Sequence, residues 1–354
     1  MLGPALFFRR ESDTLPTSPH IKQALAEFGD FRPLVVDDAF LLHKFPPRSI
    51  REIALDFGGR RPDAQILRRP SPEDLRAAIE DADVDLRFAE YLYARVGLDR
   101  DTDFYPKIGL RSVSYETPRL GLPLTLRVAP LSFWIEAQFN RRIITDLAND
   151  PRLRRLYEDC RAEILRSWRT QRRGFSLPGP SSLFVEVALV TRDQELMLVK
   201  KSAQTGGSDS RRAGRGWSCT LEEGIRWDKA DASGRLDLDA ALHIGLINEL
   251  DIEPEDIAET RWLGIALENH LNSALIGFAR VDLPQRELRA RIPNNDFEEC
   301  DFVGFQQLGK IFGRDRDGIW HTTARLRAFL TFAELAGEAA TKESVEHVRR
   351  KGPS

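Results

Sequence analysis

The stretch Trp217–Ile252 reads WSCTLEEGIRWDKADASGRLDLDAALHIGLINELDI and decides the fold. It opens with an aromatic residue and a short segment that we interpret as a strand, followed by the acidic residues and glycine of Glu222–Gly224. Its last part predicts a helix over 239–250. Apolar side chains recur there every four residues and share one face, at Leu242, Leu246 and Leu250. A strand, an acidic loop and a helix carrying Glu249 can together present carboxylates to a cation.

The same stretch resembles a degenerate Nudix box. In that family a glycine is followed after five residues by Glu, and after seven more by Arg-Glu-apolar-any-Glu-Glu-any-Gly-apolar. Laying the last apolar position on Ile252 fixes the register. The Arg-Glu pair, the Glu-Glu pair and the glycine of the box then fall on Ile244, Gly245, Asn248, Glu249 and Asp251. Glu249 and the apolar positions match the box.

The resemblance implies an α/β (α+β) fold for residues 182–337, with a Nudix-like mixed sheet sandwiched by helices. Two expected strands precede the box and further strands follow it. A final helix is expected at 318–337, as in the family. The strands before it are expected at 183–191, 195–201, 262–267, 274–281 and 297–305.

The domain organisation follows from a cluster of prolines and glycines. We expect a linker at 171–181, because two prolines and two glycines lie close together there. Residues 1–170 would form an N-terminal α/β domain of unknown fold and role. Residues 182–337 would fold as a separate Nudix-like domain, and 338–354 would be a charged tail.

If the domain is an enzyme, the resemblance implies a pyrophosphohydrolase that uses Mg²⁺. Glu249 and Glu223 are then the expected catalytic residues and metal ligands, because hard cations prefer carboxylate oxygen. Asn248 offers only a neutral oxygen, and Gly245 offers no ligand. These losses leave a second hypothesis open, an inactive Nudix-like ligand sensor or protein-interaction module. A DNA-associated regulator is a third.

A nucleoside-diphosphate-type ligand would need cations for its phosphates and a flat side chain for its base. Arginine and lysine suit phosphate, and an indole ring can stack on a nucleobase. The expected ligand-binding residues are Lys200, Lys201, Arg215, Trp217 and Asn248. The charged residues and Trp217 also have a purely structural interpretation. The charges would protect an edge strand from aggregation, and Trp217 would be buried in a core.

The N-terminal part predicts several elements. Ser71 followed by proline and acids predicts a helix to about Ala82. The amphipathic segment Ser49–Phe57 predicts another, stopped by two glycines. Ser132 is expected to cap a long helix that extends to Leu147, and Asp150 to open one more.

Composition excludes several classes of protein. The chain has 354 residues, a net charge of −3 and a pI near 6.2, which argues against a dedicated nucleic-acid binder. Its three cysteines are far apart, so we expect neither disulfides nor a zinc site. No apolar stretch approaches the ~20 residues that cross a bilayer, and the start shows no secretory pattern. We therefore expect a cytoplasmic protein without a membrane partner.

Overall fold

The computed structural model describes residues 35–36, 39–45, 50–59, 67, 69–98, 104–114, 122, 124–138, 149–170, 176–201, 217–267, 272–291, 297–304, 323–324, 326–328 and 330–335. In its first half the elements are β1 (Val35–Val36), β2 (Ala39–Lys44), β3 (Glu52–Asp56), α2 (Pro72–Asp81), α3 (Leu86–Tyr93), β4 (Pro106–Ser114), β5 (Thr125–Ser132), α4 (Phe133–Glu136) and α6 (Pro151–Thr170).

The second half contains the expected box and its flanking strands. Its elements are β6 (Ser176–Val190), β7 (Leu196–Lys201), β8 (Trp217–Ser218), β9 (Leu221–Gly224), η2 (Trp227–Lys229), β10 (Arg235–Asp237), α8 (Leu238–Leu250), η3 (Pro254–Asp256), β11 (Ile257–Leu267), β12 (Ser273–Val281), α9 (Gln285–Arg291) and β13 (Phe297–Val303). Further helical residues lie within 324–335.

The long strand β6 is the centre of a mixed sheet. The described strands form one sheet in the order β1-β2-β11-β12-β6-β4-β5-β3-β10, and β6 also pairs with β7 and β9. β12 runs parallel to β6, whereas β4, β9 and β7 run antiparallel to it. The mixed α/β fold class expected from the sequence is confirmed.

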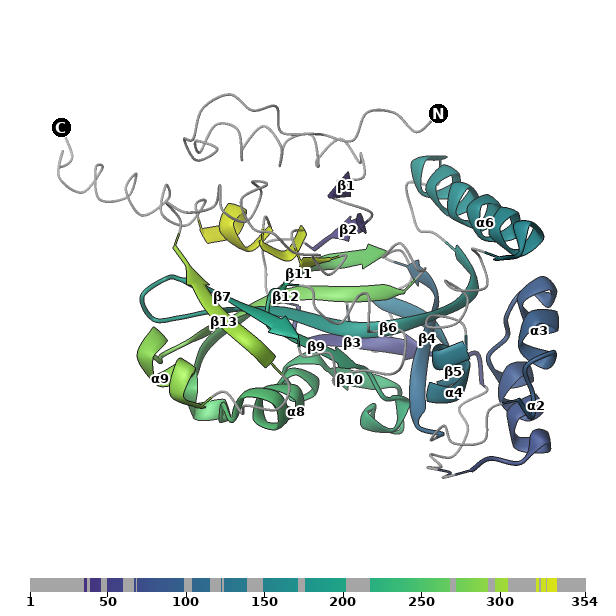
Figure 1. Ribbon diagram of the computed structural model, residues 1–354, viewed down its shortest axis with the longest axis horizontal. Coiled ribbons are helices and arrows are strands. Elements are labelled where there is room, and N and C mark those ends of the chain that lie inside the picture. Colours follow the sequence, from purple (N-terminus) through teal and green to yellow (C-terminus); the bar gives the residue numbers. More distant parts are fainter. Residues whose placement is uncertain are drawn as a thin grey trace.

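Helix α8 and the helical residues of 324–335 lie on opposite sides of the sheet (Figure 1), with a layer of core between each of them and β6. On one face, α8 contributes the three leucines predicted to be buried, and they pack in one cluster with Val185, Val187 and Leu189. On the other face, the helical residues of 324–335 pack with Ala188 and Val190. Because successive strand side chains point to opposite faces, the helices cover both sides of the sheet.

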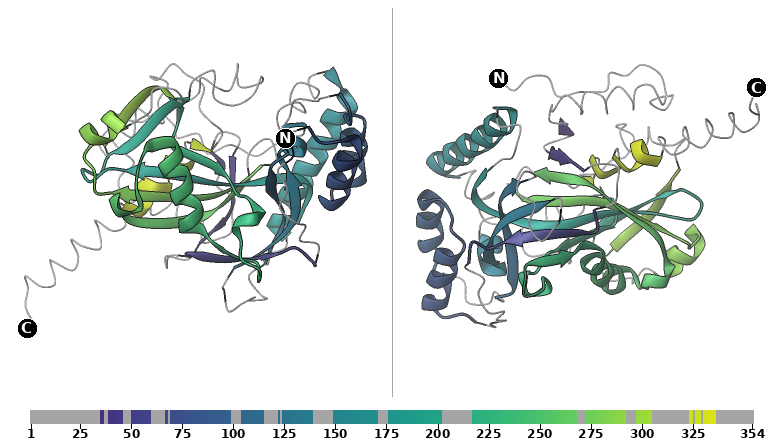
Figure 2. Two further views of the ribbon diagram at one scale, coloured as in Figure 1. Left: turned by 90° about the horizontal axis from the view of Figure 1, so that it is seen from below. Right: turned by 180° about the vertical axis from the view of Figure 1, so that it is seen from behind.

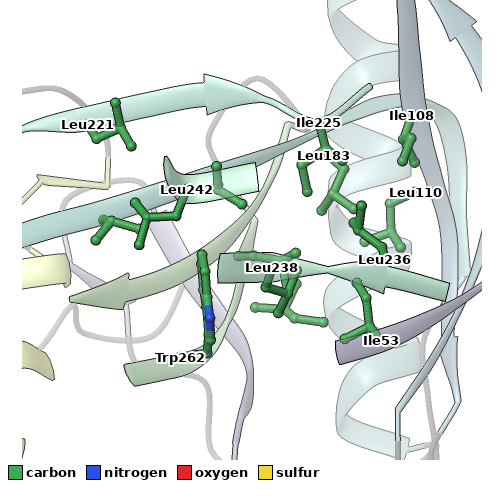
Figure 3. Close-up of a cluster of buried hydrophobic side chains, with 14 of the residues drawn as sticks. Ile53, Ile108, Leu110, Leu183, Leu221, Ile225, Leu236, Leu238, Leu242 and Trp262 are labelled. Carbon is green, nitrogen blue, oxygen red and sulfur yellow. The ribbon is translucent and has the colours of Figure 1, made fainter. Parts of the chain in front are cut away.

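The two halves of the chain share the core beneath α8 (Figure 3). Ile53 and Leu110 from the first half lie in the same cluster as Leu236 and Leu242. The segment expected to be a linker is part of the sheet from Ser176 onward, where β6 begins. Independent folding of residues 182–337 stays a prediction. Separating them from residues 1–170 would break the strand pairing that the two halves share.

Helices α2, α3 and α6 lie together at one end of the sheet (Figure 2). The predicted start of α2 is confirmed: the Ser71 hydroxyl accepts a hydrogen bond from Asp74 N–H at 3.1 Å, and the Asp74 carboxylate accepts one from Ser71 N–H. Ser132 caps α4, as predicted, by accepting from Ile135 N–H. The rest of that expected helix, 139–147, lies outside the described residues.

The prediction of a helix at Ser49–Phe57 is wrong, because Glu52–Asp56 form strand β3. β3 is enclosed between β5 and β10, and Ile53, Ala54 and Leu55 are buried in succession. A strand with neighbours on both sides and both faces covered does not need a polar face. Among the described helices, none is long and apolar enough to cross a membrane.

Candidate functional site

Helix α8 ends as the box register predicts. Its last residue, Leu250, is followed by Asp251 in the left-handed conformation with φ 52°, and then by the buried Ile252. The family pattern has its glycine at this position, and glycine is the residue that most often adopts this conformation at a helix end. Asp251 is among the few other residue types that tolerate it. The end of α8 thus has the backbone conformation in which glycine is usual, with an aspartate in its place.

Gly245 brings α8 against β9. A β-carbon at this position would lie 2.9 and 3.0 Å from the two Leu221 methyl carbons, and 3.3 Å from the Glu223 β-carbon. The family pattern places a glutamate here. In this packing no side chain fits at 245 unless Leu221 moves, so the space that a carboxylate would need is occupied by β9.

The two glutamates expected in an acidic loop lie instead in strand β9, because they pair with β6, and they point to opposite faces of the sheet. Leu221 and Glu223 approach α8, as their contacts with the Gly245 position show. Glu222 lies between them in the strand and contacts Arg327, on the face covered by 324–335. Strand alternation therefore gives α8 only one of the two glutamates, Glu223, which is half-buried.

Glu249 is the second carboxylate on the α8 side. It follows Gly245 by four residues, so both lie on one face of the helix, and it is half-buried, whereas Asn248 is exposed. In the described part of the chain, no three His, Cys, Asp or Glu side chains are grouped so that they could hold a metal ion. These residues do not fit a resident metal centre of the family type, since Mg²⁺ needs near-octahedral oxygen ligands.

The other predicted ligand residues are dispersed. Trp217 is buried in the cluster on the face opposite α8, together with Leu326 and Phe332. Lys200 is its cross-strand partner, and the Lys200 ammonium lies 2.5 Å from Glu299 Oε1. Lys201 ends β7, and Arg215 lies outside the described residues. Trp217 is therefore not on the side of Glu223 and Glu249.

A fully buried arginine on the opposite face has no counterpart in the sequence predictions. Arg327 donates to Glu222 Oε1 at 2.6 Å and to the carbonyl of Leu221 at 2.9 Å, and its Nε lies 3.6 Å from Glu186 Oε2. Burial lowers the pKa of Arg327, but the charges of Glu186 and Glu222 outweigh this and hold it above its usual value. The available signal was an arginine between Leu326 and Ala328, within the largely apolar run of the expected last helix. The cluster ties the last helix to β6 and β9.

Lys107 of β4 is a second residue that the sequence predictions missed. Its ammonium lies so close to Gly224, the last residue of β9, that a β-carbon there would be 2.0 Å from Nζ. Any side chain at 224 would therefore require the end of Lys107 to move. The signal in the sequence was a lone lysine in the apolar first part of β4, residues 106–110.

Comparisons with known proteins give structural likeness only. No family model matches the chain, and no curated protein matches it. Among solved structures, a MutT protein from Methanosarcina mazei Go1 is 17% identical, with a TM-score of 0.30 over 46% of this chain and 99% of that one. RenU, a Nudix hydrolase from M. smegmatis, is 12% identical, with a TM-score of 0.25 over 46% and 86%. DR0079 from Deinococcus radiodurans is 12% identical, with a TM-score of 0.31 over 42% and 82%.

The matched structures thus include Nudix proteins, the family that the box-like stretch resembles. Because the identities and TM-scores are this low, nothing about ligand or activity follows from them.

Proposed function

We propose that the part of the chain around β9 and α8 binds a nucleoside-diphosphate-type ligand together with the Mg²⁺ that such a ligand carries, and does not hydrolyse it. The observation that carries this proposal is the packing at Gly245. It leaves two carboxylates, Glu223 and Glu249, on the α8 side and closes the position of a third.

Two carboxylates suit a magnesium ion that arrives with its ligand. Mg²⁺ keeps several waters and is commonly bound through one or two protein carboxylates plus the phosphates of the ligand. A diphosphate without a cation would be repelled by two glutamates. Binding is therefore expected to depend on Mg²⁺.

The face of the sheet on which a residue lies decides whether it stays a predicted ligand contact. Lys201 and Arg215 stay predicted phosphate contacts, to be tested by substitution, and Asn248 stays a predicted contact at the exposed side of α8. Lys200 is left out of the proposal, because it is the cross-strand partner of Trp217 and shares its face of the sheet. We leave Trp217 out of the proposal, because it is buried on the other face of the sheet.

A second function, Mg²⁺-dependent hydrolysis of a pyrophosphate bond, is favoured by one observation. Glu249, which occupies a glutamate position of the box register, and Glu223, which precedes the box and could replace one of its missing acids, both lie on the α8 side. In that case Glu249→Gln would abolish turnover, since it keeps the shape of the side chain but removes the negative charge that a hard cation needs.

One experiment separates the two functions. Thermal unfolding is measured with ADP-ribose, dinucleotides and nucleoside triphosphates, each with Mg²⁺ and with a chelator, and product release is measured in the same samples. We expect stabilisation with Mg²⁺ only, of about 2.7 kcal/mol at a ligand concentration 100-fold above Kd, and no products. Glu249→Gln should weaken this stabilisation, and the exposed Glu255→Gln serves as control.

Mg²⁺-dependent product release that disappears in Glu249→Gln would establish the hydrolase instead. If no compound in the panel changes the unfolding temperature, the proposed ligand class is wrong.

A further inference from the structure

A cleft beside α9 lies outside the site described above, and we call it the α9 cleft. Its volume is about 480 Å³, and the described residues that line it are Gln285, Arg286, Arg289 and Ala290. They occupy one side of α9, which lies next to β7 and β13 (Figure 1). Of these lining residues, two carry a positive charge and none carries a negative charge. Such a lining favours an anion.

The α9 cleft is on the side of its helix that faces away from α8. At 100° per residue, Arg291 leaves α9 opposite the residues that line the cleft. Arg291 donates a hydrogen bond to the carbonyl of Asp251, the residue that follows α8, at 3.4 Å. This contact marks the side of α9 that is turned towards α8. The cleft is therefore separate from Glu223 and Glu249.

Three contacts hold the guanidinium of Arg289 in place. Its central carbon lies 5.2 Å from the centre of the Phe302 ring, and Nη1 donates to the carbonyl of Cys300 at 2.9 Å. Nη2 donates to the amide oxygen of Gln285 at 3.0 Å, in the amide orientation that also lets Gln285 donate to Glu195 at 3.2 Å. Arginine has five N–H donors, so donors remain for a ligand. A side chain that is already oriented loses less entropy when it binds.

Arg286 is the second cation of the cleft. It lies three residues before Arg289, so the two side chains are neighbours on the helix surface. Arg286 is exposed, and it has neither an ion pair nor a hydrogen bond with any residue in the part of the chain that the structure describes. Two neighbouring positive charges repel each other. An anion that contacts both would remove this repulsion.

The charge of the cleft indicates which anion fits. A guanidinium can make two parallel hydrogen bonds to either a phosphate or a carboxylate. A phosphate monoester carries a charge of about −1.5 to −2 at pH 7, which matches two arginines better than the single charge of a carboxylate. We propose that the α9 cleft binds the phosphate group of a small molecule through Arg286 and Arg289. This site does not depend on the proposed function of the α8 side.

Phosphate binding without divalent cations tests the cleft separately, because the ligand of the α8 side is expected to need Mg²⁺. Inorganic phosphate, ribose 5-phosphate and formate, a monoanion, are titrated by calorimetry in metal-free buffer of constant ionic strength. We expect both phosphates to bind and formate to bind at least ~10-fold more weakly. Tighter binding of ribose 5-phosphate would identify a phosphomonoester as the ligand, and equal binding would identify free phosphate.

Two variants test the arginines. Arg289→Lys keeps the charge but loses the planar fork, and Arg286→Met removes one charge, so each should weaken phosphate binding at least ~10-fold. Arg286→Met provides the test if Arg289→Lys does not fold, because Arg286 is exposed. The matched control is Arg192→Met, which removes an exposed arginine that does not line the cleft and should leave binding unchanged.

Four results would overturn the proposal. They are the absence of phosphate binding without metal, formate binding as tight as that of phosphate, equal binding by the wild type and both cleft variants, and an equal loss in Arg192→Met. The last result would show that phosphate responds only to the overall charge of the protein.

Discussion

Gly234 lies directly against the backbone carbonyl of Leu55. Leu55 N–H donates to the Gly234 carbonyl at 2.7 Å, and a β-carbon on Gly234 would be 2.5 Å from the Leu55 carbonyl oxygen. Gly234 also has a φ of 90°, which other residues rarely adopt. Strand β3 from the first half of the chain thus fixes the turn that leads through β10 into α8.

Gly234→Ala should destabilise the protein through both the backbone conformation and the collision with Leu55. Gly59 supplies the control, because its φ of 83° is similar but a β-carbon there would meet no atom within 4 Å. We expect Gly59→Ala to cost ~1–2 kcal/mol from conformation alone. Gly234→Ala should cost clearly more in urea unfolding. Equal losses would show that β3 does not hold the turn closely.

Leu246→Ala should lower the free energy of unfolding by about 2–5 kcal/mol, the range for truncating a buried leucine. Leu246 is fully buried between α8 and the sheet. Ile247, the next residue, is 38% exposed, so Ile247→Ala should cost much less. Chemical denaturation of both variants checks the orientation of α8, and similar losses would contradict it.

Arg327→Met should cost about 3–5 kcal/mol, because it leaves buried carboxylates without their cation. Glu222 and Glu186 both lie at Arg327. The triple variant Arg327→Met, Glu186→Gln, Glu222→Gln removes the charges together and should recover part of the loss. The comparison is made by thermal and urea unfolding. A triple variant that is less stable than Arg327→Met would mean that the charges are not the cause.

Thiol reagents at pH 8 should distinguish the three cysteines. Burial raises the pKa of Cys219 to about 12, and the pKa values of Cys160 and Cys300 to about 11. A raised pKa keeps the thiol protonated and unreactive at pH 8. Cys300 is only half-buried, so it should react first, and Cys219 only on unfolding. Mass spectrometry after timed labelling gives the order, and early labelling of Cys219 would contradict its burial.

Local pattern predicted α8 and the start of α2, because helical spacing and caps are written in neighbouring residues. Segment Ser49–Phe57 was misjudged, since its apolar residues suit either a helix or a doubly covered strand. The prolines at 178 and 180 suggested a linker, yet they lie in β6 where its pairing with β4 has a register shift. Proline is tolerated at such irregular positions.

The residues that the sequence did not reveal depend on distant partners. The structural role of Lys107 follows from its contact with Gly224, and that of Arg327 from its contacts with Glu186 and Glu222. The spacing of residues within one segment cannot predict such contacts, because they arise from the pairing of strands that are distant in the sequence. The placement of Glu222 and Glu223 on opposite faces is only partly predictable from the sequence. Strand alternation implies it once the strand is known.

The close packing at Gly245 bears on which side chains this position of the helix can accept. A β-carbon there would lie 2.9 and 3.0 Å from the two Leu221 methyl carbons, so Gly245→Glu requires Leu221 to move. Leu221→Ala would make room, but by itself it would open a cavity in the core. The effects of the two substitutions should therefore not add, because the residues are in contact. Each change should cost more alone than in the other's presence.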